Sequence, residues 1–218
     1  MEVKTGILEQ VDGSAVWTQN ITKVICSVSG PMEVKPRDEI PDKATLELVV
    51  RPVSGLSKIL IQDRISSVLS SIILRHLHPR SLIQLVVQVL EPGEPSFYTC
   101  RELATAINSA VVALVDAAVP LQGVAIATSL VITTDGEYVF DPDLDLLNSN
   151  DVKSNHVIGY EMANGHAERL LICESNGSFT EEQLFEALNK ASDQCEGLYK
   201  NLRSVIGESI QQKFIWKQ

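Results

Sequence analysis

Residues 107–117 read INSAVVALVDA, and this stretch indicates the fold more clearly than any other part of the chain. Apolar and small residues occupy most of its positions, and the pattern extends over residues 100–118 before Pro120 ends it. A helix that is apolar nearly all round is buried, because it has no polar face to turn towards solvent. We therefore expect a deeply buried helix over residues 100–118, with the other elements packed around it.

Before this helix, the sequence predicts β-strands. The pair Asp12-Gly13 is typical of a tight hairpin turn, which predicts one strand over residues 6–10 and a return strand from Ala15. Three further runs have the β-branched or alternating character of strands: residues 22–29, residues 44–53 and residues 82–90.

An amphipathic helix is expected between the last two of these strands. Four isoleucine and leucine residues recur at spacings of three to four, namely Ile61, Ile65, Leu69 and Ile72. This spacing places one apolar stripe on the side of the helix that faces a core. We expect the helix over residues 57–76, ended by His78-Pro79.

After the buried helix, two hairpins are expected. Asp135-Gly136 and Asn164-Gly165 are typical hairpin turns. The strands that they join are expected over residues 124–134 and 137–140, and over residues 156–162 and 168–174. The acidic segment between the hairpins, residues 141–153, is expected to be irregular or a short helix.

The end of the chain predicts a long helix. Thr180 and Gln183 form a capping box, which opens a helix of about thirty residues with Gly197 and Gly207 as candidate interruptions. No linker divides the sequence. Residues 1–218 are therefore expected to form a single α+β domain, with hairpins packed on helices.

The composition is that of an ordinary globular protein, with 44% hydrophobic and 21% charged residues among 218. The longest apolar run, residues 82–90, contains Gln84 and Gln88, so a membrane span is not expected. The N-terminus lacks the basic-then-apolar pattern of a secretion signal. Four scattered cysteines without a C-x-x-C pair argue against a disulfide framework or a zinc site and indicate a reducing compartment.

The formal net charge of −10 bears on any role with nucleic acid. An isolated nucleic-acid binder usually has the opposite charge, because its affinity comes from neutralising phosphates with Lys and Arg. If this chain works on RNA, neighbouring subunits must supply most of the positive field.

Few residues indicate catalysis by their type alone. The sequence contains no nucleophile elbow, no HExxH helix, no P-loop and no dinucleotide-binding loop. His76 and His78 could be metal ligands, although cations beside a helix C-terminus are the more common case. One acidic cluster could bind Mg²⁺ or transfer protons, although a solvated acidic loop is again more common: Asp141, Asp143, Asp145 and Asp151.

Three sets of residues, taken in order, resemble one known family. They are Asp12-Gly13-Ser14 with the strand from Thr22 to Gly30-Pro31, the I-x-x-A-x-x-A-L-x-D-A pattern of residues 107–117, and the G-x-[FL]-x-x-x-Q pattern of residues 177–183. Their order and spacing are similar to those of the RNase PH family over essentially the whole chain. The resemblance implies an RNase PH-like β-α-β-α fold of the ribosomal protein S5 domain 2-like type. Within the family, the chain is most similar to the small, acidic RNase PH-like ring subunit of the eukaryotic RNA exosome core.

The resemblance also implies which positions would carry catalysis in active members, which shorten RNA from its 3′ end by phosphorolysis. The phosphate clamp at the start of the buried helix falls here on Glu102 and Leu103, a carboxylate that repels phosphate and a side chain without a donor. The last acidic position of the catalytic segment is Leu147. The arginines that hold RNA are replaced by serines, which leaves Lys58 and Arg64 nearby as weaker RNA-contacting candidates. We therefore expect no catalytic residue, no metal ligand and no cofactor.

The expected function is that of a non-catalytic structural subunit of a hexameric exosome ring. Such a ring would thread RNA to an associated nuclease and so support 3′-to-5′ RNA processing and degradation, including that of rRNA. The partners implied are other RNase PH-like exosome subunits in a heteromeric ring, RNA-binding cap subunits, an associated exoribonuclease and RNA, with no membrane. The location implied is the nucleus, the nucleolus and the cytoplasm.

Two alternatives remain open. The first is an active phosphate-dependent 3′-to-5′ exoribonuclease in which Arg101 and Asp145 replace the lost ligands. The second is a small-molecule or peptide-binding module unrelated to RNA. Large apolar residues could contribute to ring interfaces, and the last three of them could instead fasten the final helix to its own chain: Phe97, Tyr98, Phe214, Ile215 and Trp216.

Overall fold

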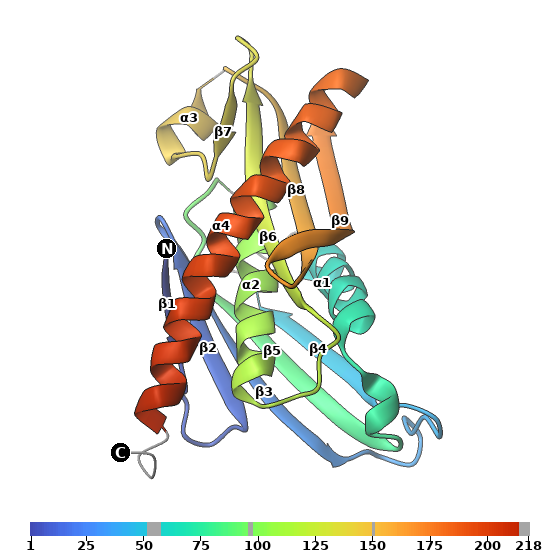
Figure 1. Cartoon of the computed structure of the whole chain (residues 1–218). Helices are drawn as coiled ribbons and strands as arrows, with labels where there is room; N and C mark the ends of the chain where they lie inside the picture. Colours follow the sequence, from blue (N-terminus) through green and yellow to red (C-terminus); the bar gives the residue numbers. More distant parts are fainter. Residues whose placement is uncertain (52–57, 96–97, 150, 214–218) are drawn as a thin grey trace.

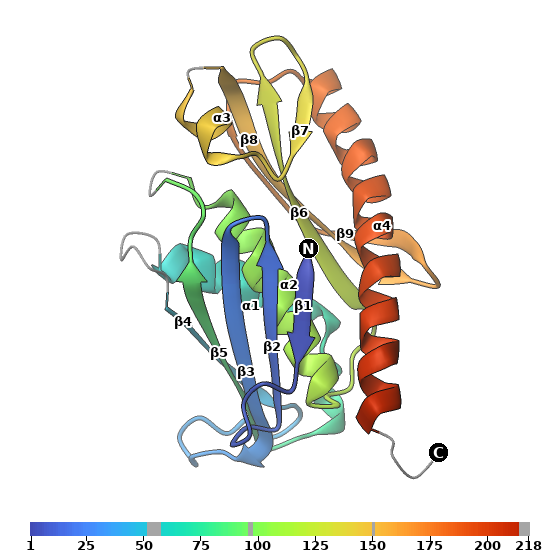
Figure 2. The same cartoon turned by 90° about the vertical axis from the view of Figure 1, so that its left-hand side faces the viewer.

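The computed structural model describes residues 1–51, 58–95, 98–149 and 151–213. Two β-sheets pack against one central helix, α2 (Cys100–Asp116), and Figures 1 and 2 show the arrangement from two sides. The first sheet has the order β1 (Glu2–Thr5), β2 (Gly13–Gln19), β3 (Thr22–Glu33), β5 (Ser81–Glu91) and β4 (Thr45–Arg51). The second has the order β7 (Tyr138–Phe140), β6 (Val124–Thr133), β8 (Val152–Ala163) and β9 (His166–Gly177). The predicted α+β class is confirmed.

The other helices connect and cover the sheets. Helix α1 (Lys58–Ile72) links β4 to β5, which are parallel, whereas the other paired strands are antiparallel. A short helix, α3 (Leu144–Asn148), follows β7. Helix α4 (Glu181–Lys213) runs along the length of the molecule and contacts both sheets. Among the described residues, none of the helices has the length and apolarity needed to cross a bilayer.

The buried helix predicted over residues 100–118 is confirmed as α2. Every residue from Cys100 to Leu114 is buried, polar ones included. Two neighbouring polar side chains of α2 form hydrogen bonds, one to each of the two sheets. The amide of Asn108 donates to the carbonyl of Ala127 and accepts from its N–H, both at 2.8 Å, and the hydroxyl of Ser109 donates to the carbonyl of Ala15 at 3.2 Å. Helix α2 is therefore hydrogen-bonded to β6 on one side and to β2 on the other.

The Asp12-Gly13 pair does not form the predicted hairpin turn, and the predicted strand over residues 6–10 is wrong. Strand β1 ends at Thr5, and the turn begins at Gly6, whose φ is 67°. Gly13 is the first residue of β2, where a Cβ would be 2.3 Å from the backbone nitrogen of Ala117. This glycine therefore permits the close approach of β2 to the end of α2.

The residues on either side of Gly13 form hydrogen bonds with residues that are distant in the sequence. The carboxylate of Asp12 accepts the backbone N–H of Gly30 at 2.7 Å. The backbone N–H of Ser14 donates to the carboxylate of Asp116 at 3.0 Å. The three-residue motif thus joins β2 to β3 and to the C-terminal end of α2.

The helix predicted over residues 57–76 ends earlier, at Ile72, and residue 57 lies outside the described residues. Ile73 instead forms a β-bridge with Leu121, and the N–H of Leu74 donates to the carbonyl of Pro120 at 3.0 Å. These contacts with the segment after α2 replace the next helical turn. A short 3₁₀ helix, Arg75–Leu77, follows.

The second half follows the prediction more closely. The turn at Asn164-Gly165 is confirmed, with φ values of 54° and 94°, although its strands are longer than expected. The capping box is confirmed, because the side chains of Thr180 and Gln183 each accept the other's backbone N–H. Neither Gly197 nor Gly207 interrupts α4.

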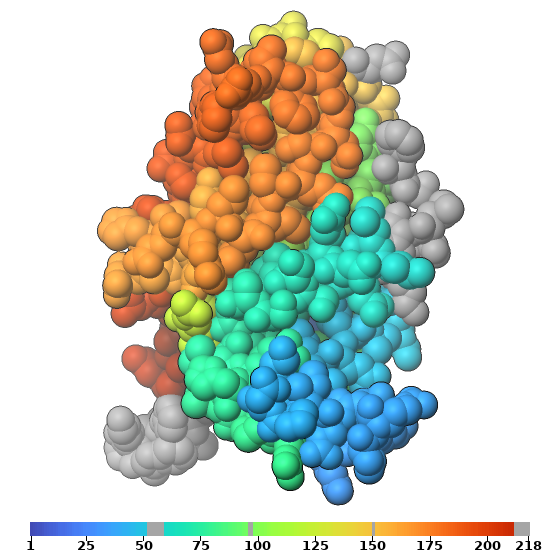
Figure 3. Space-filling view, turned by 90° about the vertical axis from the view of Figure 1, so that its right-hand side faces the viewer, coloured from blue at the N-terminus to red at the C-terminus, as the bar shows by residue number. Residues whose placement is uncertain are grey.

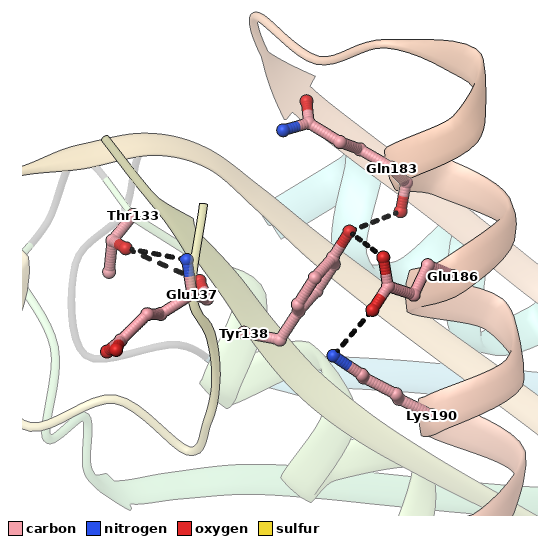
Figure 4. A network of polar contacts seen from close by, with 6 residues as sticks. All are labelled: Thr133, Glu137, Tyr138, Gln183, Glu186 and Lys190. Atoms are coloured by element: carbon pink, nitrogen blue, oxygen red, sulfur yellow. Dashed lines mark hydrogen bonds and ion pairs between the residues drawn. The ribbon is translucent and has the colours of Figure 1, made fainter. Parts of the chain in front are cut away.

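A polar network holds β7 against the first turns of α4 (Figure 4). The ammonium of Lys190 lies 3.9 Å from the centre of the Tyr138 ring and 2.8 Å from the carboxylate of Glu186. The Tyr138 hydroxyl donates to that carboxylate at 3.0 Å. The N–H of Glu137 donates to the hydroxyl of Thr133, which closes the turn between β6 and β7.

Replacing Gly13 by alanine tests the close approach of β2 to α2. Because the added Cβ would meet backbone atoms, we expect Gly13→Ala to lower the free energy of unfolding by about 1–3 kcal/mol in urea titrations. Gly197→Ala is the matched control, since a Cβ there meets nothing within 4 Å. It should raise the free energy of unfolding by about 0.5–1 kcal/mol. Equal effects of the two substitutions would contradict the assignment.

Candidate functional site

A groove of about 470 Å³ lies where the start of β8, the end of β9 and the segment before α2 meet. We call it the β8–β9 groove. It is lined by Tyr98, Val152, Lys153, Ser154, Asn155, Asn176 and Gly177. One aromatic ring, one ammonium and two amides are suited to contact a nucleotide chain, since rings stack on bases and cations pair with phosphates. No carboxylate is among these lining residues.

The lysine of the groove is held by α4. The Lys153 ammonium donates to the side-chain oxygen of Gln183 at 3.3 Å, and the same oxygen accepts the N–H of Thr180. The capping box of α4 therefore also fixes the one cation among the described residues that line the groove.

A buried histidine is hydrogen-bonded to Ser154, one of the residues that line the groove. The Nε2 atom of His156 lies 2.9 Å from the hydroxyl of Ser154, and its Nδ1 atom lies 2.8 Å from the hydroxyl of Ser175. The side chain is fully buried, with the ring of Phe179 edge-on to it at 5.0 Å. Burial lowers the pKa of His156 to about 4, so the ring is neutral at physiological pH.

The N-terminus of α2 is occupied by a carboxylate from outside the helix. The Glu94 side chain accepts the backbone N–H of Arg101 at 3.1 Å and that of Glu102 at 2.9 Å. Thr99, in the N-cap position, makes no side-chain cap. Burial, together with the nearby carboxylate of Glu102, raises the pKa of Glu94 to about 7, even though the helix N–H groups and Arg101 oppose the shift.

The side chain of Arg101 is buried and bonded to the backbone of its own chain. Its guanidinium donates to the carbonyls of Gly93 at 2.9 Å and Pro142 at 2.8 Å, and only 2% of the residue is exposed. Its Nε atom is buried and has no hydrogen-bond partner among the described residues. The side chain joins the segment before α2 to the segment after β7.

The structure does not bring the acidic cluster together. Asp141 is turned inward, where its carboxylate accepts from the side chains of Gln19 and Ser129 and its pKa is raised by burial. The other three, Asp143, Asp145 and Asp151, are exposed. In the part of the chain that the structure describes, no three Asp, Glu, His or Cys side chains are arranged to hold a metal ion.

The predicted degenerate positions are buried. Glu102 is 4% exposed and Leu103 3% exposed in the first turn of α2, and burial raises the pKa of Glu102. Leu147 is 5% exposed on α3. None of the three lines the β8–β9 groove.

The two predicted RNA contacts lie elsewhere. Arg64 of α1 forms an ion pair with Glu174 of β9, with 3.3 Å between Nε and Oε2, on the face where α1 and β9 lie side by side (Figure 3). Lys58 is the first residue of α1, and its side chain is outside the described part of the structure. Of the predicted interface residues, Phe97, Phe214, Ile215 and Trp216 also fall outside it, whereas Tyr98 lines the β8–β9 groove.

Neither Glu94 nor Lys153 is indicated as a site residue by the sequence alone. Glu94 stands six residues before the helix whose N–H groups it binds, and no local capping pattern indicates it. The one sequence feature that could have indicated Lys153 is its position as a single cation directly after an acidic segment.

The neutral state of His156 gives a pH-dependent prediction. A histidine in an unfolded chain has a pKa near 6.5, so between pH 6.5 and pH 4 the unfolded state binds more protons and stability falls as pH falls. We expect the wild-type free energy of unfolding to drop by about 2 kcal/mol more than that of His156→Gln between about pH 7 and about pH 4.5. Urea titrations at both pH values measure the difference, in which the carboxylates common to both proteins cancel. Equal losses in the two proteins would refute the assignment.

Known proteins with similar sequences belong to one family. A model of the 3′ exoribonuclease family, domain 1, matches residues 1–120. The exosome complex component RRP46 of Saccharomyces cerevisiae is 36% identical over 99% of both chains. Its counterpart in Schizosaccharomyces pombe is 35% identical over 94% of this chain and 89% of that protein. The archaeal exosome complex component Rrp41 of Archaeoglobus fulgidus is 28% identical over 94% of this chain and 81% of its own.

Solved structures give the same result. The crystal structure of rice Rrp46 superposes with a TM-score of 0.76, at 26% identity, and covers 91% of this chain and 92% of that one. A chain of an archaeal exosome core has the same fold, with a TM-score of 0.75 over 93% of this chain and 85% of its own. The predicted RNase PH-like fold is therefore confirmed, and the chain belongs to the RNase PH family of 3′ exoribonucleases.

Proposed function

We propose that this chain is a non-catalytic subunit of an exosome ring, in which it contacts RNA without cleaving it. Near full-length likeness to exosome complex components named RRP46 in two yeasts supports the ring assignment. The observation that carries the non-catalytic part is the burial of Glu102, Leu103 and Leu147, which stand where active relatives would hold phosphate and an acidic group.

A groove with this lining can bind RNA, but its described lining residues include no acidic group that could act at the scissile bond. Transfer to phosphate needs donors that hold the attacking phosphate and groups that position the reacting oxygens. The lysine and the two amides can contact a phosphate or a base, and Tyr98 can stack. With a net charge of −10, the chain would depend on neighbouring subunits for most of its attraction to RNA.

The ring proposal brings partners and a location with it. The partners are other RNase PH-like subunits in a heteromeric, six-membered ring, RNA-binding cap subunits and an associated exoribonuclease that receives the threaded RNA. Contacts between different subunits in a ring are heterologous, so the chain would present two unlike faces to its two neighbours. The proposed location is the nucleus, the nucleolus and the cytoplasm, where the assembly would process and degrade RNA, including rRNA.

The second candidate, an active phosphate-dependent 3′-to-5′ exoribonuclease, is favoured by the description of the matching family, which names 3′ exoribonucleases. It requires Arg101 to hold phosphate and Asp145 to act at the scissile bond. The guanidinium of Arg101 donates to backbone carbonyls of its own chain, and Asp145 is exposed on α3 and does not line the groove. The geometry therefore favours the non-catalytic role.

An activity assay on the intact assembly separates the two candidates. The assembly is isolated through a tag on this chain, with either the wild-type residue or Asn at position 145, and is given 5′-labelled RNA with and without inorganic phosphate. Because Asp145 lies outside the groove, we expect Asp145→Asn to leave the rate of RNA shortening unchanged under both conditions. Phosphate-dependent shortening that disappears with Asp145→Asn would establish the enzyme instead.

A further inference from the structure

An apolar pocket of about 250 Å³ lies at the end of the molecule where α2 ends. Strand β1, the C-terminal end of α2 and the last described turns of α4 meet there (Figure 2). Most of the described residues that line it are apolar: Val112, Val115, Ala118, Ile206 and Ile210. The pocket is therefore at the opposite end of α2 from Tyr98 and the β8–β9 groove.

The pocket lies where the burial of α2 stops. Every residue from Cys100 to Leu114 is buried, whereas Val115 is half-buried and Ala118 is exposed. On the facing side of the pocket, Ile210 of α4 is 44% exposed. Part of the apolar surface of both helices is thus left uncovered at this end, and covering it with another apolar group would be favourable.

The apolar surface continues from the pocket towards the turn after β1. Ile7 and Leu8 of this turn are exposed. The N–H of Leu8 donates to the hydroxyl of Ser14 at 2.9 Å, and the N–H of Ser14 donates to the carboxylate of Asp116, which lines the pocket. Exposed apolar surface that is gathered in one place, with polar groups around it, marks a site where another segment binds.

The sequence that follows α4 supplies apolar residues next to this surface. The end of α4 is held beside β1, because the hydroxyl oxygens of Ser209 and Thr5 lie 2.8 Å apart in a hydrogen bond. Residues 214–218 read FIWKQ and lie outside the described residues. Three large apolar residues in succession therefore follow directly on a helix end that borders an apolar pocket.

Residues 214–218 are long enough to reach the pocket. Lys213, the last residue of α4, is three residues beyond Ile210, which is a rise of about 4.5 Å along the helix. An extended chain spans about 3.3–3.6 Å per residue. Trp216 is three residues beyond Lys213, so its side chain can reach the pocket even when the chain turns back along α4.

The size and charge of the pocket suit an aromatic side chain with a cation close by. At about 250 Å³ the pocket is smaller than the roughly 300–1,000 Å³ that hold drug-sized ligands, so a single large side chain fits it better. The one charged group among the described lining residues is the carboxylate of Asp116. Residues 214–218 contain Lys217 and no acidic side chain.

We propose that this pocket binds residues 214–218 of its own chain, so that the side chains of Phe214 and Trp216 cover Ile206 and Ile210. This inference goes beyond the proposed function and does not depend on the ring assignment. The bound segment fastens α4 to α2 and withdraws its apolar residues from contacts with neighbouring subunits. A second copy of this chain and a segment of another protein are the other occupants that an apolar pocket could take.

Tryptophan fluorescence of the full-length protein tests where residue 216 lies. The chain has two tryptophans, and Trp17 is fully buried, so quenching by acrylamide reports mainly on Trp216. We expect Ile210→Asp to raise the quenching constant at least about threefold, because a charge in the pocket displaces the apolar ring. Phe185→Asp is the matched control and should leave quenching unchanged, since Phe185 is an exposed apolar residue of α4 that does not line the pocket.

Methyl resonances cover the case in which Ile210→Asp does not fold, which circular dichroism would reveal. Trp216→Ala changes only the segment that is proposed to bind. Loss of the aromatic ring should shift the methyl resonances of Val115 and Ile206, which line the pocket, and leave those of Ile59 on α1 in place. Unchanged resonances of the pocket residues would contradict the proposed contact.

The quenching experiment also has outcomes that would overturn the proposal. Trp216 that is quenched as readily as in a free peptide of residues 213–218 would show that the segment is not bound. Equal quenching of the wild type and Ile210→Asp would place the ring elsewhere. Protection that rises with protein concentration would assign the pocket to a second copy, and protection found only in the isolated assembly would assign it to a neighbouring subunit.

Discussion

The structure depends on the burial of α2 between two sheets, with its polar side chains hydrogen-bonded to both. A buried amide or hydroxyl without a partner costs free energy, so Asn108 and Ser109 fix how β6 and β2 approach the helix. The two ends of α2 are held in the same way. Asp116 accepts the N–H of Ser14 at one end, and Glu94 binds the helix N–H groups at the other.

The candidate site follows from this arrangement. Because α2 is fixed between the sheets, the segment before it lies beside the start of β8 and the end of β9, and these three segments form the β8–β9 groove. The capping box of α4 orients Lys153, and His156 supports Ser154. The groove is thus built from well-held side chains, and its lysine, amides and aromatic ring suit the proposed contact with RNA.

Much of the fold could be predicted from the sequence, because burial leaves a strong periodic pattern. The buried helix, the β5 strand and the Asn164-Gly165 turn are examples. The turn at Asp12-Gly13 was predicted wrongly because a glycine that permits close packing and one that forms a turn look alike in sequence, and only the distance to Ala117 distinguishes them. The site was harder to predict, because the groove joins residues from three distant segments and the contact of Glu94 with α2 depends on the path of a loop.

The proposed function makes this chain one subunit among related but different chains. The most direct test is the native mass and subunit composition of the tagged protein, isolated gently from its own cells. The account predicts a stable assembly that contains several different RNase PH-like chains. A free monomer would contradict the ring assignment, and an assembly made only of copies of this chain would contradict the heteromeric ring and favour an active enzyme.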